Sequence, residues 1–133
     1  MIKAVIDTNV FLSGLFWDGK PKQVLELAFT KKVVGVTSPA ILLELENKLL
    51  QKFRYPEDQV KKYIELILSH FMVVEAKFKL SAVPDDHTDN KIIEAALEAK
   101  ANYIVTGDNH LLKLKVFNNV KILDPGNFLR STQ

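Results

Sequence analysis

The chain begins its first regular pattern with Lys3-Ala4-Val5-Ile6-Asp7, a short apolar run that stops at an acidic residue. Near the other end, Tyr103-Ile104-Val105-Thr106-Gly107-Asp108 has the same form. Short apolar and β-branched runs bounded by turn-forming residues are typical of buried strands. Ligands bind at the carboxyl ends of strands in an open parallel sheet. We therefore expect the two aspartates to converge on one mouth of such a sheet.

Strand-like and helix-like segments alternate between these two runs. Further strands are predicted at 33–37, 71–75 and 120–123. Helices are predicted from about Pro21 to Phe29, over 38–51, from Pro56 onward and over 89–100, each with apolar residues at helical spacing. The segment that contains Gly14 and Gly19 is expected to be a loop. This alternation predicts an α/β fold with a parallel sheet, right-handed crossovers and helices on both faces.

Composition and length predict one globular domain over residues 1–133, with 47% hydrophobic and 26% charged residues. No apolar run approaches the roughly 20 residues that span a bilayer, so no membrane association is expected. The N-terminal apolar run is too short for a signal peptide, and an acidic residue, Asp7, follows it directly. Cysteine is absent, which excludes disulfides, zinc–thiolate sites and cysteine nucleophiles. A cytoplasmic location is the default expectation.

Four acidic residues stand where strands end or helices begin: Asp7, Glu44, Asp89 and Asp108. Carboxylates that converge in one pocket repel one another unless a cation or a proton compensates. Hard divalent cations prefer oxygen ligands. The pattern therefore predicts a Mg²⁺ or Mn²⁺ site, with phosphodiester cleavage as the leading chemistry.

The residues alone leave structural roles open for each of these acids. Asp7 and Asp108 are also placed to cap a loop or a helix. Asp89 stands in a first helical turn, where the helix dipole stabilises an acid in any case. Glu44 and Glu46 lie at opposite margins of the apolar face of their helix, so periodicity does not choose between them.

Several other polar residues have weaker claims. Asn9 and Thr106 are candidates for orienting a ligating carboxylate. Asp85, Asp86 and Asp89 place three carboxylates within five residues. This segment lacks the glycine and the glutamate that an EF-hand calcium loop requires. Glu75 and Asp124 also follow apolar runs, and neither is assigned to the site. No phosphate-binding glycine loop and no Gly-x-Ser-x-Gly motif is present in the sequence.

The charge balance points toward a polyanionic partner once the candidate site is set aside. The net charge is only +2, from 18 basic and 16 acidic residues. With the four candidate acids excluded, 18 basic residues face 12 acidic ones. A basic surface around an acidic, metal-filled pocket suits a nucleic acid. Because only Arg54 and Arg130 are arginines, bidentate recognition of phosphate or guanine by arginine is limited.

The order of these segments resembles that of PIN-domain proteins across nearly the whole chain. Val5-Ile6-Asp7-Thr8-Asn9 is similar to their opening segment, and Ser38-Pro39 followed by Leu43-Glu44-Leu45 to their second acidic segment. Asp89-Asn90-Lys91-Ile92 and Ile104-Val105-Thr106-Gly107-Asp108 resemble the third and fourth. The closing Ile122-Leu123-Asp124-Pro125 is similar to the branch of toxin components of toxin–antitoxin systems.

The resemblance implies a PIN-like three-layer α/β/α sandwich whose parallel sheet has four or five strands in the order 3-2-1-4-5. It implies a VapC-like endoribonuclease that uses one or two Mg²⁺ or Mn²⁺ ions to cleave single-stranded RNA. A small antitoxin is the expected protein partner, with a homodimer or higher oligomer as a further candidate assembly. It assigns catalysis and metal binding to Asp7, Glu44, Asp89 and Asp108, which selects Glu44 over Glu46. Asn9 and Thr106 match supporting polar positions.

Two other function classes remain as alternatives. A phosphatase-like phosphoryl-transfer enzyme would use Asp7 as its nucleophile, but such sites typically carry a second aspartate two residues later, where this chain has Asn9. A non-catalytic module would hold RNA or a protein without cleaving it. Turnover on RNA separates both alternatives from the nuclease.

Overall fold

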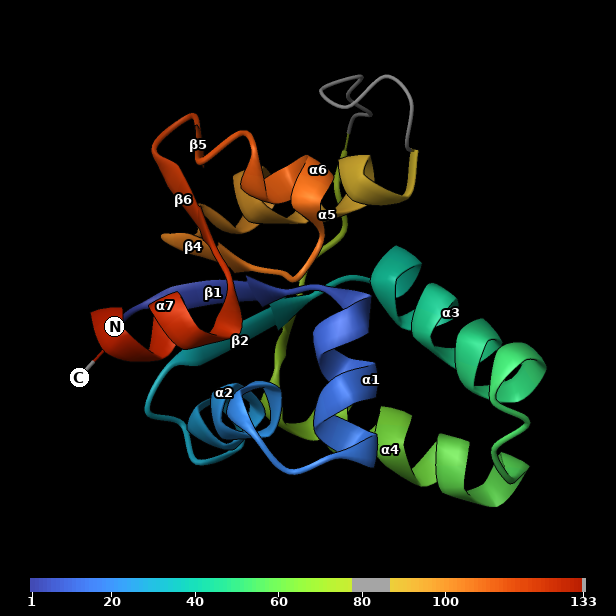
Figure 1. Cartoon of the computed structure of the whole chain (residues 1–133). Helices are drawn as coiled ribbons and strands as arrows, with labels where there is room; N and C mark the ends of the chain where they lie inside the picture. Colours follow the sequence, from blue (N-terminus) through green and yellow to red (C-terminus); the bar gives the residue numbers. More distant parts are fainter. Residues whose placement is uncertain (78–86, 133) are drawn as a thin grey trace.

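A six-stranded sheet runs through the centre of the molecule (Figure 1). It is seen in a computed structural model that describes residues 1–77 and 87–132, with side chains for 1–77 and 90–132. The strands are β1 (Lys3–Ile6), β2 (Val34–Thr37), β3 (Met72–Val73), β4 (Tyr103–Val105), β5 (Val116–Phe117) and β6 (Val120–Leu123), in the order β3-β2-β1-β4-β6-β5. Five of them are parallel, which confirms the predicted order because β6 is the fifth strand expected from the sequence.

The edge strand β5 was not predicted. It pairs antiparallel with β6, and the two are joined by Asn118 and Asn119, both with positive φ (48° and 69°). Asparagine tolerates this left-handed conformation better than most residues, and two-residue hairpin turns require it. The Asn-Asn pair is therefore a hairpin signal that is present in the sequence.

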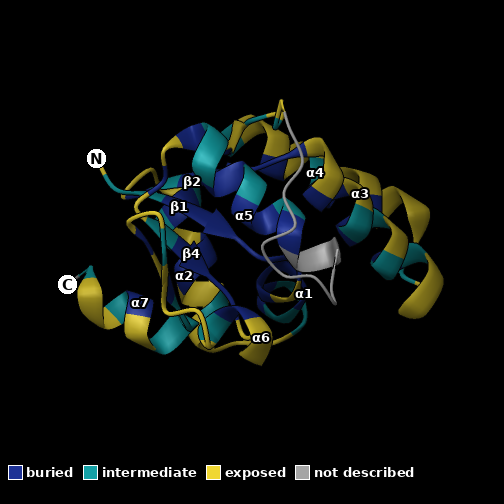
Figure 2. Cartoon of the chain, turned by 90° about the horizontal axis from the view of Figure 1, so that it is seen from above, coloured by how far each residue is buried: buried dark blue, intermediate teal, exposed yellow. Residues whose placement is uncertain are grey.

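Helices cover both faces of the sheet, as predicted. On one face lie α1 (Thr8–Phe16), α2 (Lys20–Phe29) and α7 (Pro125–Ser131), and on the other lies α5 (His87–Ala99) (Figure 1). The central strands β1 and β4 are buried from both sides, whereas the outer surfaces of the helices are exposed (Figure 2). In residues 1–77 and 87–132, no helix has the length and hydropathy needed to cross a membrane.

Helix α1 replaces the loop that was expected after Asp7. Its residues Val10, Phe11 and Leu12 are all buried, because it packs between the sheet and the neighbouring helices. A helix buried on most sides lacks the polar stripe that makes amphipathic helices recognisable. Gly14, which suggested a loop, is a packing residue: a β-carbon there would collide with the side chain of Leu25 on α2.

This close approach gives the first testable expectation. Gly14→Val should destabilise the fold by about 1–3 kcal/mol, because overpacking a dense interface forces its side chains or backbone to shift. Leu25 is 3% exposed and has little room to move. The measurement is the free energy of unfolding from urea titration, with Gly107→Ala as control because a β-carbon there meets nothing within 4 Å. Equal stability of the Gly14 variant and the wild type would contradict this account of the α1–α2 contact.

The helices that carry the second acidic segment follow the predicted pattern. Helix α3 (Pro39–Asn47) begins after Ser38, whose Oγ accepts a hydrogen bond from the Ile41 backbone N–H at 3.2 Å. A π-helical turn, η1 (Lys48–Lys52), continues it, and α4 (Glu57–His70) follows. The predicted apolar face is buried at Ile41, Leu42, Leu45 and Leu49.

The C-terminal helix α7 was not predicted. Asp124 caps it by accepting a hydrogen bond from the Asn127 backbone N–H at 2.7 Å, and Pro125 occupies the first turn. A capping residue followed by proline is the same start signal as Ser38-Pro39. This role also accounts for an acid after β6 that has no part in the candidate site.

Candidate active site

Asp7 lies at the carboxyl end of β1 and is 6% exposed. Its backbone N–H donates to the Val105 carbonyl of β4 at 3.0 Å, and its Oδ2 accepts a hydrogen bond from Thr106 Oγ1 at 2.6 Å. Although Asp7 stands at the cap position of α1, its side chain makes no capping hydrogen bond. The carboxylate is therefore held by the neighbouring strand and is not used to end the helix.

The electrostatic surroundings of Asp7 disfavour its charged form. Burial raises the pKa of Asp7 above its ordinary value of 3.8, and the charges of Glu44 and Asp108 raise it further. Hydrogen bonds from Thr106 and from the Thr8 backbone act in the opposite direction without reversing the shift. A buried carboxylate near two like charges is costly unless a proton or a cation offsets the repulsion.

Glu44 reaches this edge of the sheet from α3. Its Oε1 accepts a hydrogen bond at 2.5 Å from Oγ1 of Thr8, the residue that follows Asp7. Two ammonium groups lie close: Lys91 Nζ is 3.4 Å from Oε1, and Lys48 Nζ is 3.6 Å from Oε2. Through these contacts, the Glu44 side chain of α3 reaches both α1 and α5, on the side of α3 that faces Asp7.

Asp108 follows β4, which is hydrogen-bonded to β1. Its backbone N–H donates to Thr106 Oγ1 at 3.0 Å, so one hydroxyl connects Asp108 to Asp7. Its Oδ1 accepts a hydrogen bond from the His110 backbone N–H at 2.8 Å and caps the short helix α6 (Asn109–Leu112). Capping uses one oxygen, and a carboxylate has further acceptor capacity.

Asp89 belongs to the first turn of α5, but its side chain lies outside the described residues, as do Asp85 and Asp86. Lys91, two residues later, contacts Glu44, so this end of α5 lies at the same edge of the sheet. The site role of Asp89 stays a prediction.

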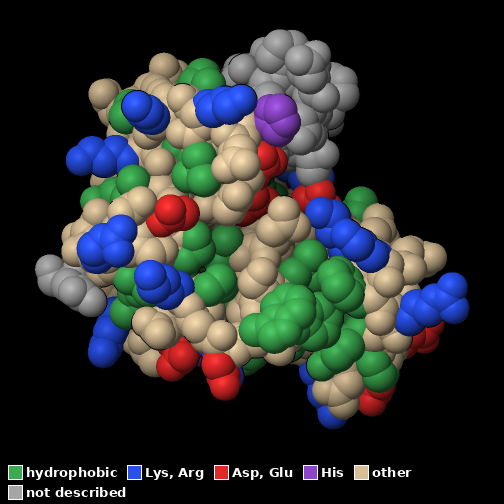
Figure 3. All heavy atoms as spheres, in the orientation of Figure 1, with side chains coloured by type: hydrophobic (Ala, Val, Ile, Leu, Met, Phe, Trp, Pro, Cys, Tyr) green, Lys and Arg blue, Asp and Glu red, His purple; other side chains and the backbone are tan. Residues whose placement is uncertain are grey.

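The acidic side chains that the structure describes at this site offer the oxygen ligands that a hard divalent cation prefers. Asp7, Glu44 and Asp108 offer only carboxylate oxygens, and Asp7 is buried within the influence of the other two. Among the side chains that the structure describes, however, no three acids or histidines lie close enough together to form a ligand set. Figure 3 shows acidic side chains gathered in a hollow at this edge with basic side chains beside them.

The sequence offers six lysines as candidates for an RNA-binding groove, without choosing among them: Lys20, Lys22, Lys48, Lys52, Lys91 and Lys113. The structure places Lys48 and Lys91 beside Glu44, whereas Thr8 was not expected at the site. Lys48 stands four residues after Glu44, the spacing at which a glutamate and a lysine meet on one helix face. That spacing was available in the sequence and is a signal that Glu46 lacks. Asn9, expected beside a carboxylate, instead accepts a hydrogen bond from Lys48 Nζ at 3.4 Å.

The raised pKa of Asp7 predicts a pH-dependent stability difference. In the folded protein Asp7 binds a proton more tightly than in the unfolded chain, so it destabilises the fold as pH rises above 3.8. Each pKa unit corresponds to about 1.4 kcal/mol at neutral pH. Asp7→Asn keeps an acceptor for Thr106 and removes the charge, so with chelator it should match or exceed wild-type stability at pH 7.

The advantage of Asp7→Asn should shrink as pH falls toward 3.8, where the wild-type carboxylate also becomes neutral. Urea titrations of both proteins between pH 4 and 7 measure it. A variant that is less stable than the wild type at pH 7 would contradict the electrostatic account of Asp7.

Comparison with protein families places this arrangement in a known group. The model of the PIN domain family matches residues 3–110, which include all four candidate acids. The chain belongs to the PIN domain family. Members of this family are generally nucleases, and PIN nucleases generally use divalent metal ions. A relative named Uncharacterized protein MJ1680, from Methanocaldococcus jannaschii, is 38% identical over 119 residues, covering 86% of this chain and 76% of that protein.

Solved structures with the same fold support the PIN architecture independently of sequence. One is a chain of VapBC2 from Rickettsia felis, in a crystal structure with a bound DNA fragment from the VapBC2 promoter. It superposes with a TM-score of 0.66 and 16% identity, and the match covers 91% of this chain and 97% of that chain. PAE2754 from Pyrobaculum aerophilum superposes with a TM-score of 0.64 and 15% identity, covering 98% and 89%. At these identities the likeness concerns the fold.

Proposed function

We propose that this protein is a Mg²⁺- or Mn²⁺-dependent endoribonuclease that cleaves single-stranded RNA with a single PIN domain spanning residues 1–133. The observation that carries the proposal is the buried carboxylate of Asp7, held by Thr106 and electrostatically coupled to Glu44 and Asp108. Asp89 completes the proposed catalytic and metal-binding set. The cytoplasm is the expected compartment.

Each residue of the site has a defined task in this reaction. One or two bound ions would supply a water of lowered pKa and stabilise charge on the phosphate. Thr106 holds the Asp7 carboxylate through its hydroxyl, and Thr8 holds that of Glu44. The ammonium groups of Lys48 and Lys91 lie beside Glu44, where they attract the phosphates that flank the cleaved bond. No protein nucleophile is required.

Single-stranded RNA is the proposed form of the substrate. The basic residues near the site are lysines, which act as point charges toward phosphate rather than as bidentate readers of base edges. The bases of an A-form duplex are poorly exposed, whereas unpaired bases are accessible to a protein. The expected selectivity is therefore for unpaired segments.

A toxin role with a small antitoxin partner is the proposed biological setting. One fold neighbour is a chain of VapBC2. This protein also has a partly exposed aromatic cluster, in which the ring centroids of Trp17, Phe53 and Tyr55 lie 5.0–5.7 Å from that of Phe16. Trp17 is 63% exposed and Phe53 40%. Contiguous exposed apolar surface of this kind is typical of protein interaction sites, for an antitoxin or for a second copy of the chain.

Turnover on RNA tests the proposed function. The protein is incubated with mixed-sequence single-stranded RNA in Mn²⁺, and a parallel sample contains chelator. Cleavage is expected in Mn²⁺ alone, with fully paired RNA resistant. Binding without cleavage would support the non-catalytic module instead, and covalent trapping of phosphate on Asp7 would support the phosphatase-like alternative.

A further inference from the structure

Helix α1 and the helix formed by α3 and η1 pack together, and both lead away from the candidate site. At the site, Thr8 Oγ1 donates to Glu44 Oε1 at 2.5 Å. At the far end, the ring centroid of Phe16, the last residue of α1, lies 5.0 Å from that of Phe53, which follows η1. The surface along these helices therefore connects the acidic site to the aromatic cluster.

The distance between the two ends suits a short stretch of single strand. Glu44 and Phe53 are nine residues apart, which at about 1.5 Å per helical residue corresponds to roughly 13 Å. A stacked strand advances about 3.4 Å per nucleotide, so about four nucleotides cover this distance. Figure 3 shows hydrophobic side chains gathered below the acidic hollow, with basic side chains above them and to their right.

We infer that the aromatic cluster is a base-stacking platform for the single strand of RNA whose cleaved bond lies at the candidate site. The inference rests on the proposed function, because it assumes that RNA reaches this surface from the acidic site. It deepens that function by naming where the strand is held outside the site. A protein partner that covered the same rings would displace the strand.

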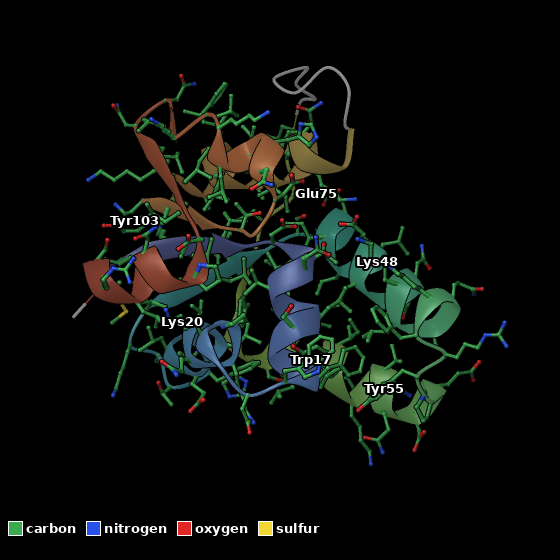
Figure 4. All side chains as sticks on the ribbon, in the orientation of Figure 1. Trp17, Lys20, Lys48, Tyr55, Glu75 and Tyr103 are labelled. Atoms are coloured by element: carbon green, nitrogen blue, oxygen red, sulfur yellow. The ribbon has the colours of Figure 1, made fainter. Side chains whose placement is uncertain are left out.

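Two rings of the cluster have exposed surface for a base. Trp17 is 63% exposed and Phe53 40%. Both contact Phe16, with their ring planes at 69° and 44° to that of Phe16, and Tyr55 contacts Phe16 at 77°. Figure 4 shows Trp17 and Tyr55 beyond the lower part of α1, with Lys48 above them and nearer the site. Exposed aromatic rings hold single strands without sequence preference, because every base has a flat face.

Cations alternate with these rings, which favours a nucleic acid over a protein as the occupant. Lys52, Phe53, Arg54 and Tyr55 follow one another in the chain, and residues 48–56 contain three cations and no acid. The Lys52 ammonium lies 5.6 Å from the centroid of the Phe53 ring. A base on this ring would therefore bring its phosphate near a cation. Lysine is depleted in protein–protein interfaces, whereas a basic groove with aromatic rings is typical of single-strand binding.

The acids that adjoin the cluster in the sequence have other surroundings. Asp18, which follows Trp17, pairs with Lys22 at 3.0 Å. Glu57 and Asp58 stand in the first turn of α4, where the helix dipole favours negative charge. Among the residues that the structure describes, neither Lys52 nor Arg54 pairs with an acid, so both cations are available to phosphate.

Trp17 is the only tryptophan of the chain, so its fluorescence reports directly on the platform. The Asp7→Asn protein, in chelator, is titrated with a single-stranded RNA long enough to reach from the site to the cluster. The same titration uses an abasic strand of equal length, which keeps the phosphates and lacks the bases. The RNA should quench the fluorescence because a stacked base contacts the indole ring, whereas the abasic strand should not. Binding of RNA without quenching, or equal quenching by both strands, would overturn the inference.

Substitutions separate stacking from general apolar contact. Trp17→Leu and Trp17→Phe are each added to Asp7→Asn, and affinity is measured by the fluorescence anisotropy of labelled RNA. Trp17→Leu should weaken binding about fivefold or more because it removes the ring, and Trp17→Phe should retain most of the affinity. Val116→Ala, at an exposed apolar residue of the opposite edge strand β5, is the matched control and should change nothing.

Two results would assign the cluster a different role. Equal affinities of the Trp17→Leu and Trp17→Phe proteins for RNA would overturn stacking. A Trp17→Leu protein that binds RNA normally but changes from dimer to monomer in gel filtration would assign the cluster to contact between copies of the chain, and would also overturn the inference.

Cleavage in Mn²⁺ by proteins with Asp7 intact separates failure of this inference from failure of the proposed function. Trp17→Leu should raise KM with little change in kcat, because stacking outside the site holds substrate and transition state alike. Normal cleavage without quenching in the binding experiment overturns the platform and leaves the nuclease intact. Quenching by RNA without cleavage by the wild type supports the platform and overturns the nuclease.

Discussion

Asp7→Asn is expected to abolish RNA cleavage while leaving the protein folded. The amide keeps the size of the side chain and an acceptor for Thr106, but it loses the charge that would hold a metal ion. A metal ion supplies several kcal/mol of transition-state stabilisation, so the rate should fall on the order of a thousandfold or more. Single-turnover cleavage of RNA in Mn²⁺ measures the effect, and a circular dichroism spectrum verifies the fold.

Glu44 and Glu46 provide the matched pair for this experiment. Both are glutamates on α3, but Glu44 contacts Thr8 and two lysines at the site. Glu44→Gln should reduce cleavage strongly, whereas Glu46→Gln should be nearly silent. Wild-type rates from the Asp7 variant would assign Asp7 a structural role only. A strong effect at Glu46 with none at Glu44 would show that the helix assignment is wrong.

The sheet was predictable because its signals are local and agree with one another. Each parallel strand is a short apolar run between polar or turn-forming segments, and alternation with helices requires parallel crossovers. The adjacency of β1 and β4, which brings Asp7 and Asp108 to one edge, came from the family resemblance. The register of those strands, Ile6 opposite Val105, agrees with it.

Helix α1 was not predictable from periodicity because tertiary packing overrides the local signal. Its sequence is apolar on most sides, and its glycine serves close packing against Leu25 rather than a turn. Helix α7 and the β5–β6 hairpin are different cases. Asp124-Pro125 and Asn118-Asn119 carry recognised start and turn signals, and both could have been found from the sequence.

The position of an acid at a strand end did not by itself identify a site residue. Asp124 follows β6 and caps a helix, whereas Asp7 follows β1 and makes no cap. The difference lies in burial and in neighbours: Asp7 is enclosed by β4 and influenced by Glu44 from a separate helix. Those neighbours arise from three-dimensional packing, which a strand-end pattern does not contain.

Mn²⁺ should stabilise the folded protein strongly if the carboxylates bind metal. Asp7 is buried near Glu44 and Asp108, so a cation that binds only the native state relieves their repulsion. At a metal concentration of 100 times Kd, the stabilisation is about 2.7 kcal/mol. For a chain of this size that corresponds to an increase in Tm of about 10 °C. Thermal melts with Mn²⁺ and with chelator measure it.

The same melts distinguish binding at this site from general ion effects. Asp7→Asn should lose most of the Mn²⁺-dependent increase because it removes a proposed ligand, whereas Glu46→Gln should keep it. The comparison detects metal binding through the stability of the fold and does not require an RNA substrate. An unchanged wild-type Tm in millimolar Mn²⁺ would argue against a metal site, and an equal increase in the Asp7 variant would place the bound metal elsewhere on the protein.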